Sequence, residues 1–130
     1  MKPKILLAFV LVACCWGESA MAKGSQLLQQ CQETLLIFDG GTSKHPADAA
    51  RCLGTINGTV DGLDIANSFY SDQVKKDLPP VICWPDEAVT KDQSVRIIVK
   101  YLREHPEKLH MGNSLLITLA LVSAFPCGKG

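Results

Sequence analysis

Cysteine is the residue type in this sequence with the widest range of possible chemistry, and its spacing decides which chemistry is open to it. No two cysteines are spaced as Cys-x-x-Cys, and no histidine follows a cysteine at that spacing, so a zinc site has no scaffold here. Two of the six cysteines lie in an N-terminal apolar segment, and the others follow it: Cys31, Cys52, Cys83 and Cys127. Four cysteines in a small exported chain indicate disulfides. Oxidised cysteines cannot act as nucleophiles.

Three histidines and one pair of aspartates are the remaining candidates for catalysis or metal binding. His45 and His105 each precede a proline at the start of an expected helix, where a capping or exposed role is the common one. His110 lies at an expected core edge, where a hydrogen bond is more common than catalysis. Asp61 and Asp64 are spaced to share a helix face, but no further ligand lies near them, which favours a solvated face. We therefore predict no catalytic residue, no metal site, no cofactor and no enzymatic activity.

The N-terminus has the pattern of a secretion signal. Lys2 and Lys4 precede an apolar run from Ile5 to Val12, and Ala20-Met21-Ala22 forms a small-x-small site. Cleavage after the second alanine would divide the chain into a leader, 1–22, and a mature domain, 23–130. The apolar run is shorter than the ~20 residues that a membrane-spanning helix needs. The run also ends in a sequence that resembles a lipobox, so a lipid anchor on Cys14 is the alternative to soluble release.

The overall composition fits a small secreted domain and excludes one class of partner. The chain has 130 residues, with 13 basic and 13 acidic side chains and no net charge. It holds no basic run and no interleaving of basic with aromatic residues, so we expect no nucleic-acid partner. The part that follows the leader is long enough for one domain with one hydrophobic core.

Apolar residues recur at helical spacing in four stretches, and no stretch reads as a strand. The first expected helix covers residues 25–38 and is stopped by the Asp-Gly-Gly that follows. The second begins near Pro46, because proline is favoured at a first helical position, and ends around Asn67 or Tyr70. Ser71 to Pro80 is charged and closes with two prolines, and we interpret it as a loop.

The third helix has the clearest start signal. Thr90 and Gln93 fit a capping box, in which two side chains satisfy free backbone N–H groups. An apolar stripe follows, and His105-Pro106 ends the helix, because a residue before proline avoids helical geometry. Pro106 is also suited to open the fourth helix, which we expect to reach about Phe125. The second half of that helix is apolar nearly all round, which is typical of a central core helix, and it is too short for a membrane span.

This order of helices sets the cysteines opposite one another. Cys31 lies about as far before the end of the first helix as Cys52 lies after the start of the second. Cys83 precedes the third helix and Cys127 follows the fourth, so a second antiparallel pair brings these two together. Among the possible connectivities, the topology favours Cys31–Cys52 with Cys83–Cys127. The predicted fold is an all-α, small four-helix domain of two antiparallel helix pairs, stapled by two disulfides.

A stripe of three glycines runs along the second expected helix: Gly54, Gly58 and Gly62 lie four residues apart. Each glycine costs about 1 kcal/mol relative to alanine inside a helix. Close approach of another backbone would compensate for that cost, so we interpret the stripe as a packing surface. The neighbour is either another helix of the same chain or a second subunit, and a kinked or broken helix is the alternative.

Several short motifs resemble those of one protein family in order and spacing. Cys52-Leu53-Gly54 with Gly58 and Asp61 resembles its Cys-x-Gly-x-x-x-Gly helix, and Cys83-Trp84-Pro85 resembles its Cys-x-Pro step. The stretch from Tyr101 to His110 looks like its Tyr-Leu … Pro-Glu … Leu-His junction, and Phe125-Pro126-Cys127 looks like its ending. From about Cys31 to Cys127 the chain is similar to the Rap/Tai group of type VI secretion immunity proteins.

The resemblance implies a binding protein in the periplasm of a Gram-negative bacterium. Members of the group neutralise a peptidoglycan amidase of the papain-like type that neighbouring cells deliver, often as homodimers whose exposed elements cover the toxin's groove. We therefore expect inhibition without chemistry, and a homodimer for which the glycine stripe is available.

We assign effector binding to the expected loop, through Asp72, Lys75, Lys76 and Asp77. The two prolines of this loop limit the entropy lost on docking, although a solvated connector is the alternative interpretation. Two other functions stay open at this point. One is a periplasmic stress chaperone that binds unfolded clients in acid, and the other is an enzyme or enzyme subunit that uses His110 or Asp61.

Overall fold

The structure is a computed structural model that describes residues 22–74 and 79–128. Its helices are α1 (Lys23–Phe38), α2 (Pro46–Val74), α3 (Lys91–Glu104) and α4 (Asn113–Ala124), with a short 3-10 helix, Pro106–Lys108, before α4. These two ranges contain no strand. The predicted all-α, four-helix class is therefore confirmed. Residues 1–21 of the predicted leader, including the alternative lipid site at Cys14, lie outside the described residues.

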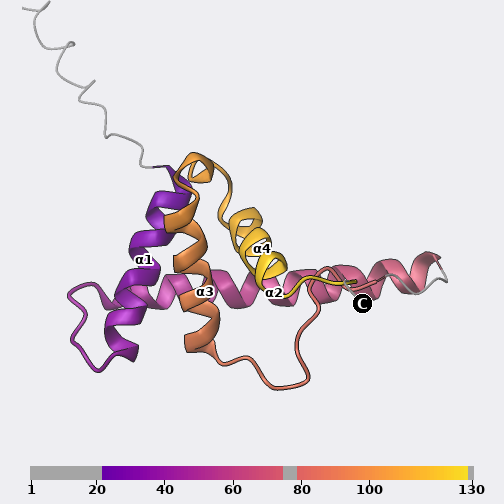
Figure 1. The fold of residues 1–130 in the computed structure, drawn as a ribbon, viewed down its shortest axis with the longest axis horizontal. Coiled ribbons are helices and arrows are strands. Elements are labelled where there is room, and N and C mark those ends of the chain that lie inside the picture. Colours follow the sequence, from indigo (N-terminus) through magenta and orange to yellow (C-terminus); the bar gives the residue numbers. More distant parts are fainter. Residues whose placement is uncertain (1–21, 75–78, 129–130) are drawn as a thin grey trace, which may run out of the picture.

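The four helices surround one core. α1 and α3 lie side by side, and the long α2 passes behind both, while α4 packs against α3 and the middle of α2 (Figure 1). The C-terminal end of α2 projects beyond the other helices (Figure 1). Each helix contributes side chains to the buried cluster, which includes Leu27, Cys31, Cys52, Ile56, Val95, Ile98, Leu102, Leu116, Ile117 and Leu121.

Glycines fix both ends of α1. The Gly24 N–H donates to the Leu109 carbonyl at 2.9 Å, which ties the start of α1 to the turn before α4. A Cβ at Gly24 would lie 2.6 Å from that carbonyl oxygen, so only glycine allows this approach. At the other end, Gly40 adopts a φ of 81°. The N–H groups of Gly40 and Gly41 donate to Ile37 and Leu36, which closes α1 in a Schellman motif, as the Asp-Gly-Gly stop predicted.

The start of α2 is predicted correctly, but its end is not. Pro46 is the first residue of the helix, and the helix continues to Val74 instead of ending at Asn67 or Tyr70. The first part of the segment that we interpreted as a loop, Ser71 to Val74, is therefore helical. Charge does not end a helix, and the prolines restrict only the residues directly before them. Residues 75–78 lie outside the described residues.

α3 begins and ends where the sequence predicts. The Thr90 hydroxyl accepts a hydrogen bond from the Gln93 backbone N–H at 3.1 Å, so Thr90 is the N-cap. The predicted apolar stripe is buried, with Val95 and Ile98 fully covered. His105 is the C-cap, and its N–H donates to the Tyr101 carbonyl.

The fourth helix starts later than predicted. Pro106 opens the short 3-10 helix, and α4 begins only at Asn113, after Gly112 as its N-cap. The chain between them makes hydrogen bonds between residues three apart, from Leu109 N–H to Pro106 and from Met111 N–H to Lys108. α4 buries one face in the core, as expected of a core helix, while Leu115 remains 49% exposed.

Both predicted disulfides are present, so the predicted connectivity is confirmed. Cys31 and Cys52 join α1 to α2 with their Cα atoms 5.1 Å apart, and both side chains are fully buried. Cys83 and Cys127 have Cα atoms 5.0 Å apart. The second bridge holds the segment before α3 against the segment after α4, so both irregular stretches are fixed to the bundle.

Candidate functional site

The glycine stripe faces away from the bundle. A Cβ placed on Gly54, Gly58 or Gly62 would have no atom of the described chain within 4 Å, apart from the helix's own backbone. Of the two neighbours that we considered, a helix of the same chain is therefore excluded among the described residues, and packing against a second subunit stays a prediction. The helix is not broken here, because α2 is continuous through all three positions. Ile65 and Phe69 continue the same face of the helix and are 70% and 60% exposed.

The four charged residues assigned to effector binding are only partly placed by the structure. Asp72 lies in the last turn of α2, with an exposed side chain, rather than in a loop. Lys75, Lys76 and Asp77 lie outside the described residues. The structure thus neither brings these four side chains together nor separates them.

The candidates for catalysis do not converge. Asp61 and Asp64 are exposed on α2, and His45 is exposed before its first turn. His110 is exposed in the turn before α4, because that helix starts later than we expected. Within residues 22–74 and 79–128, no group of three or more His, Cys, Asp and Glu side chains is placed to hold a metal ion.

One histidine is part of a polar cluster at the end of α3. The rings of His105 and Tyr101 lie 4.3 Å apart, and His105 Nδ1 lies 3.1 Å from a carboxylate oxygen of Glu107. Lys108 Nζ donates to the Tyr101 hydroxyl at 3.0 Å and lies 5.1 Å from the centre of its ring. Hydrogen bonds from its own backbone N–H and from His105 lower the pKa of Glu107. The cluster joins the end of α3 to the 3-10 helix.

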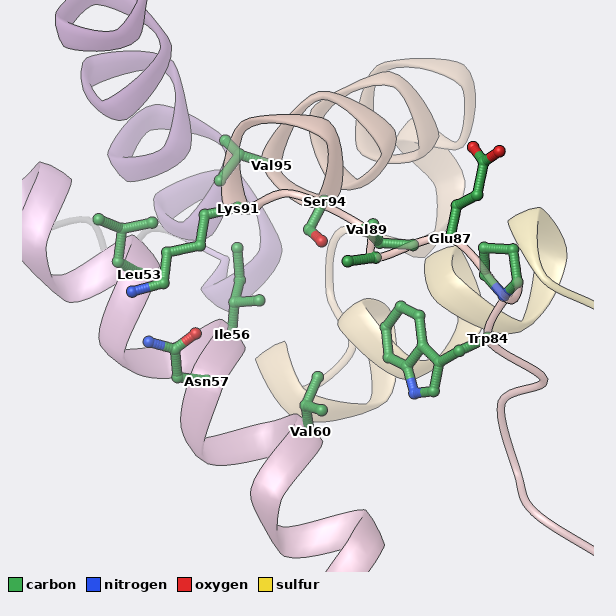
Figure 2. A pocket seen from close by; sticks show the side chains of 12 residues that line it. Leu53, Ile56, Asn57, Val60, Trp84, Glu87, Val89, Lys91, Ser94 and Val95 are labelled. Carbon is green, nitrogen blue, oxygen red and sulfur yellow. The ribbon is translucent and has the colours of Figure 1, made fainter.

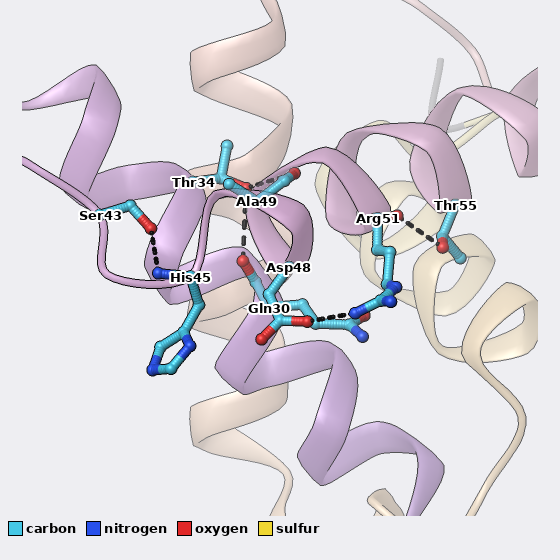
Figure 3. Close-up of polar contacts among 8 residues, drawn as sticks. All are labelled: Gln30, Thr34, Ser43, His45, Asp48, Ala49, Arg51 and Thr55. Carbon is cyan, nitrogen blue, oxygen red and sulfur yellow. Dashed lines mark hydrogen bonds and ion pairs between the residues drawn. The ribbon is translucent and has the colours of Figure 1, made fainter.

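Polar contacts also fix α1 against α2. The buried Thr34 hydroxyl, on α1, donates to the Ala49 carbonyl, on α2, at 3.0 Å (Figure 3). The His45 backbone N–H donates to the Ser43 hydroxyl, which orders the connection before α2 (Figure 3). Arg96, on α3, pairs with Asp39 at the end of α1, and the hydrogen bonds to Asp92 and Asp39 raise the pKa of Arg96. These contacts hold the helices that form the candidate site in a fixed arrangement.

A cavity lies between α2, the segment before α3, and the first turns of α3 (Figure 2). Its volume is about 340 Å³. Its apolar wall consists of Leu53, Ile56, Val60, Trp84, Pro85, Ala88, Val89 and Val95. Trp84 packs against Phe125, with ring centres 5.3 Å apart, and the neighbouring disulfide holds its backbone. The wall around Trp84 belongs to an irregular segment, and these two contacts hold that segment against the C-terminal part of the chain.

Four polar side chains complete the cavity, and they are unevenly distributed. Asn57 and Lys91 lie at one side, Ser94 lies near Val89 in the middle, and Glu87 lies at the side of Trp84 (Figure 2). Figure 2 shows the Lys91 side chain extending toward α2, whereas the Glu87 carboxylate points away from the apolar wall. One end of the cavity is thus cationic and the other is aromatic.

The comparisons with known proteins identify a family for this chain. The model of the Rap1a immunity proteins matches residues 23–127, which includes all four helices and both disulfides. The chain belongs to the Rap1a immunity proteins. Membership indicates immunity to a secreted effector and binding of that effector. No curated protein and no solved structure gave a significant match to this Rap1a protein.

The sequence of this Rap1a protein predicts neither the cavity nor the polar cluster at Tyr101. The cavity could not be predicted because its wall comes from three separate segments of the chain. The one sequence signal for it is Trp84 beside Cys83, an aromatic residue held near a disulfide. The polar cluster at Tyr101 could not be predicted because the motif there indicates only a junction between helices.

No helix in the described part of the chain is both long enough and apolar enough to span a membrane.

Proposed function

We propose that this Rap1a protein protects its producer by binding and inhibiting a papain-like peptidoglycan amidase that a type VI secretion system delivers into the periplasm. The observation that carries the proposal is the family match across residues 23–127. The two disulfides support an oxidising compartment such as the periplasm, and the signal pattern at residues 1–22 supports export. We propose that the protein acts without a cofactor and is not an enzyme.

Inhibition in this proposal is steric. The described cysteines are all in disulfides, so none is a thiolate able to attack the toxin. A rigid domain can inhibit by placing an exposed element over an active-site groove, because little conformational entropy is lost when both surfaces are preformed. We retain as a proposal that Asp72, Lys75, Lys76 and Asp77 provide part of that surface, since Asp72 lies in the last turn of the projecting α2 and the other three follow that helix in the sequence.

The first test is whether the adjacent reading frame encodes a small amidase with a catalytic Cys and His, and the direct test then uses that enzyme. Wild-type protein should bind that amidase stoichiometrically in a pull-down and abolish its hydrolysis of peptidoglycan without being consumed. A Lys75→Glu/Lys76→Glu variant should bind more weakly if this segment contacts the toxin, while Lys100→Glu/Arg103→Glu, at two exposed positions of α3, serves as a charge-matched control. Full inhibition by the double variant would remove the segment from the interface, and failure of the wild type to bind would refute the amidase assignment.

We also propose a homodimer that uses the outward face of α2. This face contains the glycine stripe and continues into Ile65 and Phe69, so a second α2 can approach its backbone closely and cover both side chains. Gly58→Leu should abolish the dimer in analytical ultracentrifugation without lowering the stability of the monomer, because the chain itself leaves this position open. A wild type that sediments as a monomer at high concentration would exclude the dimer.

One observation favours a second function, a periplasmic chaperone. The end of α2 exposes apolar side chains around much of its circumference, with Ile65, Phe69, Tyr70 and Val74 each more than half exposed. Such a surface can bind unfolded clients. Suppression of client aggregation in acid, together with no binding of the neighbouring amidase, would support the chaperone over the immunity protein.

A further inference from the structure

The cavity between α2 and the start of α3 has the features of a binding site for a small ligand. Its volume of about 340 Å³ lies at the lower end of the range for ligand sites. Its wall is mostly apolar, with a few polar groups at one side, which is the usual composition of such sites. Other pockets lie on the surface of the domain, including one of about 320 Å³ beside Leu35 and Arg96, but this one has the more extensive apolar wall.

Lys91 sets the charge of the ligand. It lines the cavity, and within residues 22–74 and 79–128 no carboxylate pairs with it. The nearest acid in sequence, Asp92, is engaged by Arg96, whose Nε donates to it at 3.0 Å. Lys91 is also the first residue of α3, where the helix dipole adds positive potential. The polar side of the cavity therefore favours an anion.

The opposite end sets the orientation of the ligand. Trp84 presents an aromatic surface there, and Glu87 beside it disfavours a second negative charge. A ligand with an anionic group at one end and an apolar body matches both ends at once. Asn57 lies on the side of Lys91, and its side-chain amide is a neutral donor for a carboxylate. The Ser94 hydroxyl donates to the Thr90 carbonyl at 3.2 Å and is therefore not counted among these donors.

We infer that this cavity binds a small amphipathic carboxylate, with its apolar chain beside Trp84 and its carboxylate at Lys91. The ligand class is a medium-chain fatty acid or a compound of the same shape and charge. The inference does not depend on the proposed amidase, because the cavity is complete within one chain. It adds a small-molecule site to a protein whose family is defined by binding another protein.

Tryptophan fluorescence tests the inference directly. The chain has two tryptophans, and in a Trp16→Phe background Trp84 alone reports on the cavity. Decanoate, added to the oxidised protein below its micelle concentration, should change the Trp84 emission saturably. Decanol, which has the same chain without the charge, should bind about five-fold more weakly, the factor expected for one exposed ion pair.

Matched variants separate the site from general effects of charge. Lys91→Gln should reduce the affinity for decanoate about five-fold and leave that for decanol unchanged, again the factor of one exposed ion pair. Lys100→Gln, on the same helix but outside this cavity, should change neither affinity. Val60→Phe should fill the cavity and abolish the binding of both compounds, with circular dichroism to show that the fold is retained.

Three outcomes would overturn the inference. They are the absence of a saturable response to decanoate, equal affinities for decanoate and decanol, and equal effects of Lys91→Gln and Lys100→Gln. If decanoate fails to bind and Val60→Phe instead abolishes capture of the neighbouring amidase, the occupant is a side chain of the partner protein, and the inference is wrong while the proposed function stands.

Discussion

Adding a single methyl group at Gly24 should destabilise the protein. The new Cβ would lie 2.6 Å from the Leu109 carbonyl oxygen, 2.9 Å from Leu109 Cα and 2.6 Å from Leu116 Cδ1. Two of these atoms belong to the backbone, and Leu116 is fully buried, so none can move away freely. Overpacking of this kind costs about 1–3 kcal/mol. The shift also strains the hydrogen bond from Gly24 to Leu109, which contributes roughly 1 kcal/mol.

The opposing gain in helix propensity is at most about 1 kcal/mol, so the net loss for Gly24→Ala is about 2 kcal/mol. In a domain of this size that lowers the melting temperature by roughly 10 °C. The same substitution at Gly54, where a Cβ meets open space, should instead raise the stability of the monomer by up to about 1 kcal/mol.

Thermal unfolding followed by circular dichroism, with disulfides intact and at a concentration where sedimentation shows a monomer, measures both variants. The two changes are chemically identical and differ only in what surrounds them. If Gly24→Ala melts at or above the temperature of the wild type, the close contact between α1 and the turn before α4 is wrong. If Gly54→Ala destabilises the monomer, the outward orientation of the stripe is wrong.

Three further outcomes follow from the contacts described above. Thr34→Val should cost about 1 kcal/mol in chemical denaturation, because it removes the buried bond to Ala49. Thr118→Val, whose hydroxyl bonds within its own helix, should change stability by less than about 0.5 kcal/mol. Removing the second bridge by Cys83→Ser/Cys127→Ser should cost about 2–4 kcal/mol, and thiol titration of the denatured, unreduced wild type should find no free thiol at the four bridged positions. The pKa of Glu107 is lowered in the folded state. The contribution of Glu107 to stability is therefore present above its ordinary pKa of 4.5 and is lost as the pH falls through the lowered value. The Glu107→Gln variant should accordingly lose stability less steeply than the wild type as the pH is lowered.

Local rules determine most of what could be predicted of this fold. A helix start depends on a few neighbouring residues, so Pro46 and the Thr90 cap were readable in the sequence. The Asp-Gly-Gly after α1 was readable for the same reason. The disulfide pairing required one further step, the assumption that consecutive helices contact each other. Both bridges formed as predicted, although α2 crosses α1 instead of running antiparallel beside it (Figure 1).

The wrong predictions rest on local signals that are compatible with more than one structure. Pro106 suits the first turn of any helix, but the turn that it opens is a 3-10 helix that ends before Gly112. The cost of glycine inside a helix predicts a contact surface at Gly54, Gly58 and Gly62, and the open space there excludes only a contact within the described chain, so the contact with a second subunit stays a prediction. That argument identifies a position that tolerates glycine, and it cannot tell which side of the helix faces the core.

The cavity was beyond prediction for a different reason. Its residues come from α2, from the segment around Trp84 and from α3, and the distances among these segments depend on how the helices cross. Hydrophobic periodicity identified Ile56 and Val95 as inward-facing, which is correct. It could not show that the space between such residues is left partly open near Val60.

The two surfaces proposed for binding use different sides of α2 and are therefore separable by mutation. A helix turns once in about 3.6 residues, so the outward stripe at Gly58 and the cavity wall at Ile56 and Val60 point in different directions. The apolar wall meets a cation and an aromatic ring, which suits a small anion, whereas the stripe meets only solvent and continues into the exposed Phe69, which suits another helix. Gly58→Leu should consequently change assembly without altering the affinity for decanoate, and Val60→Phe should do the reverse. If either substitution changed both properties, the two sites would be parts of one interface, and the assignment of separate ligands to them would have to be abandoned.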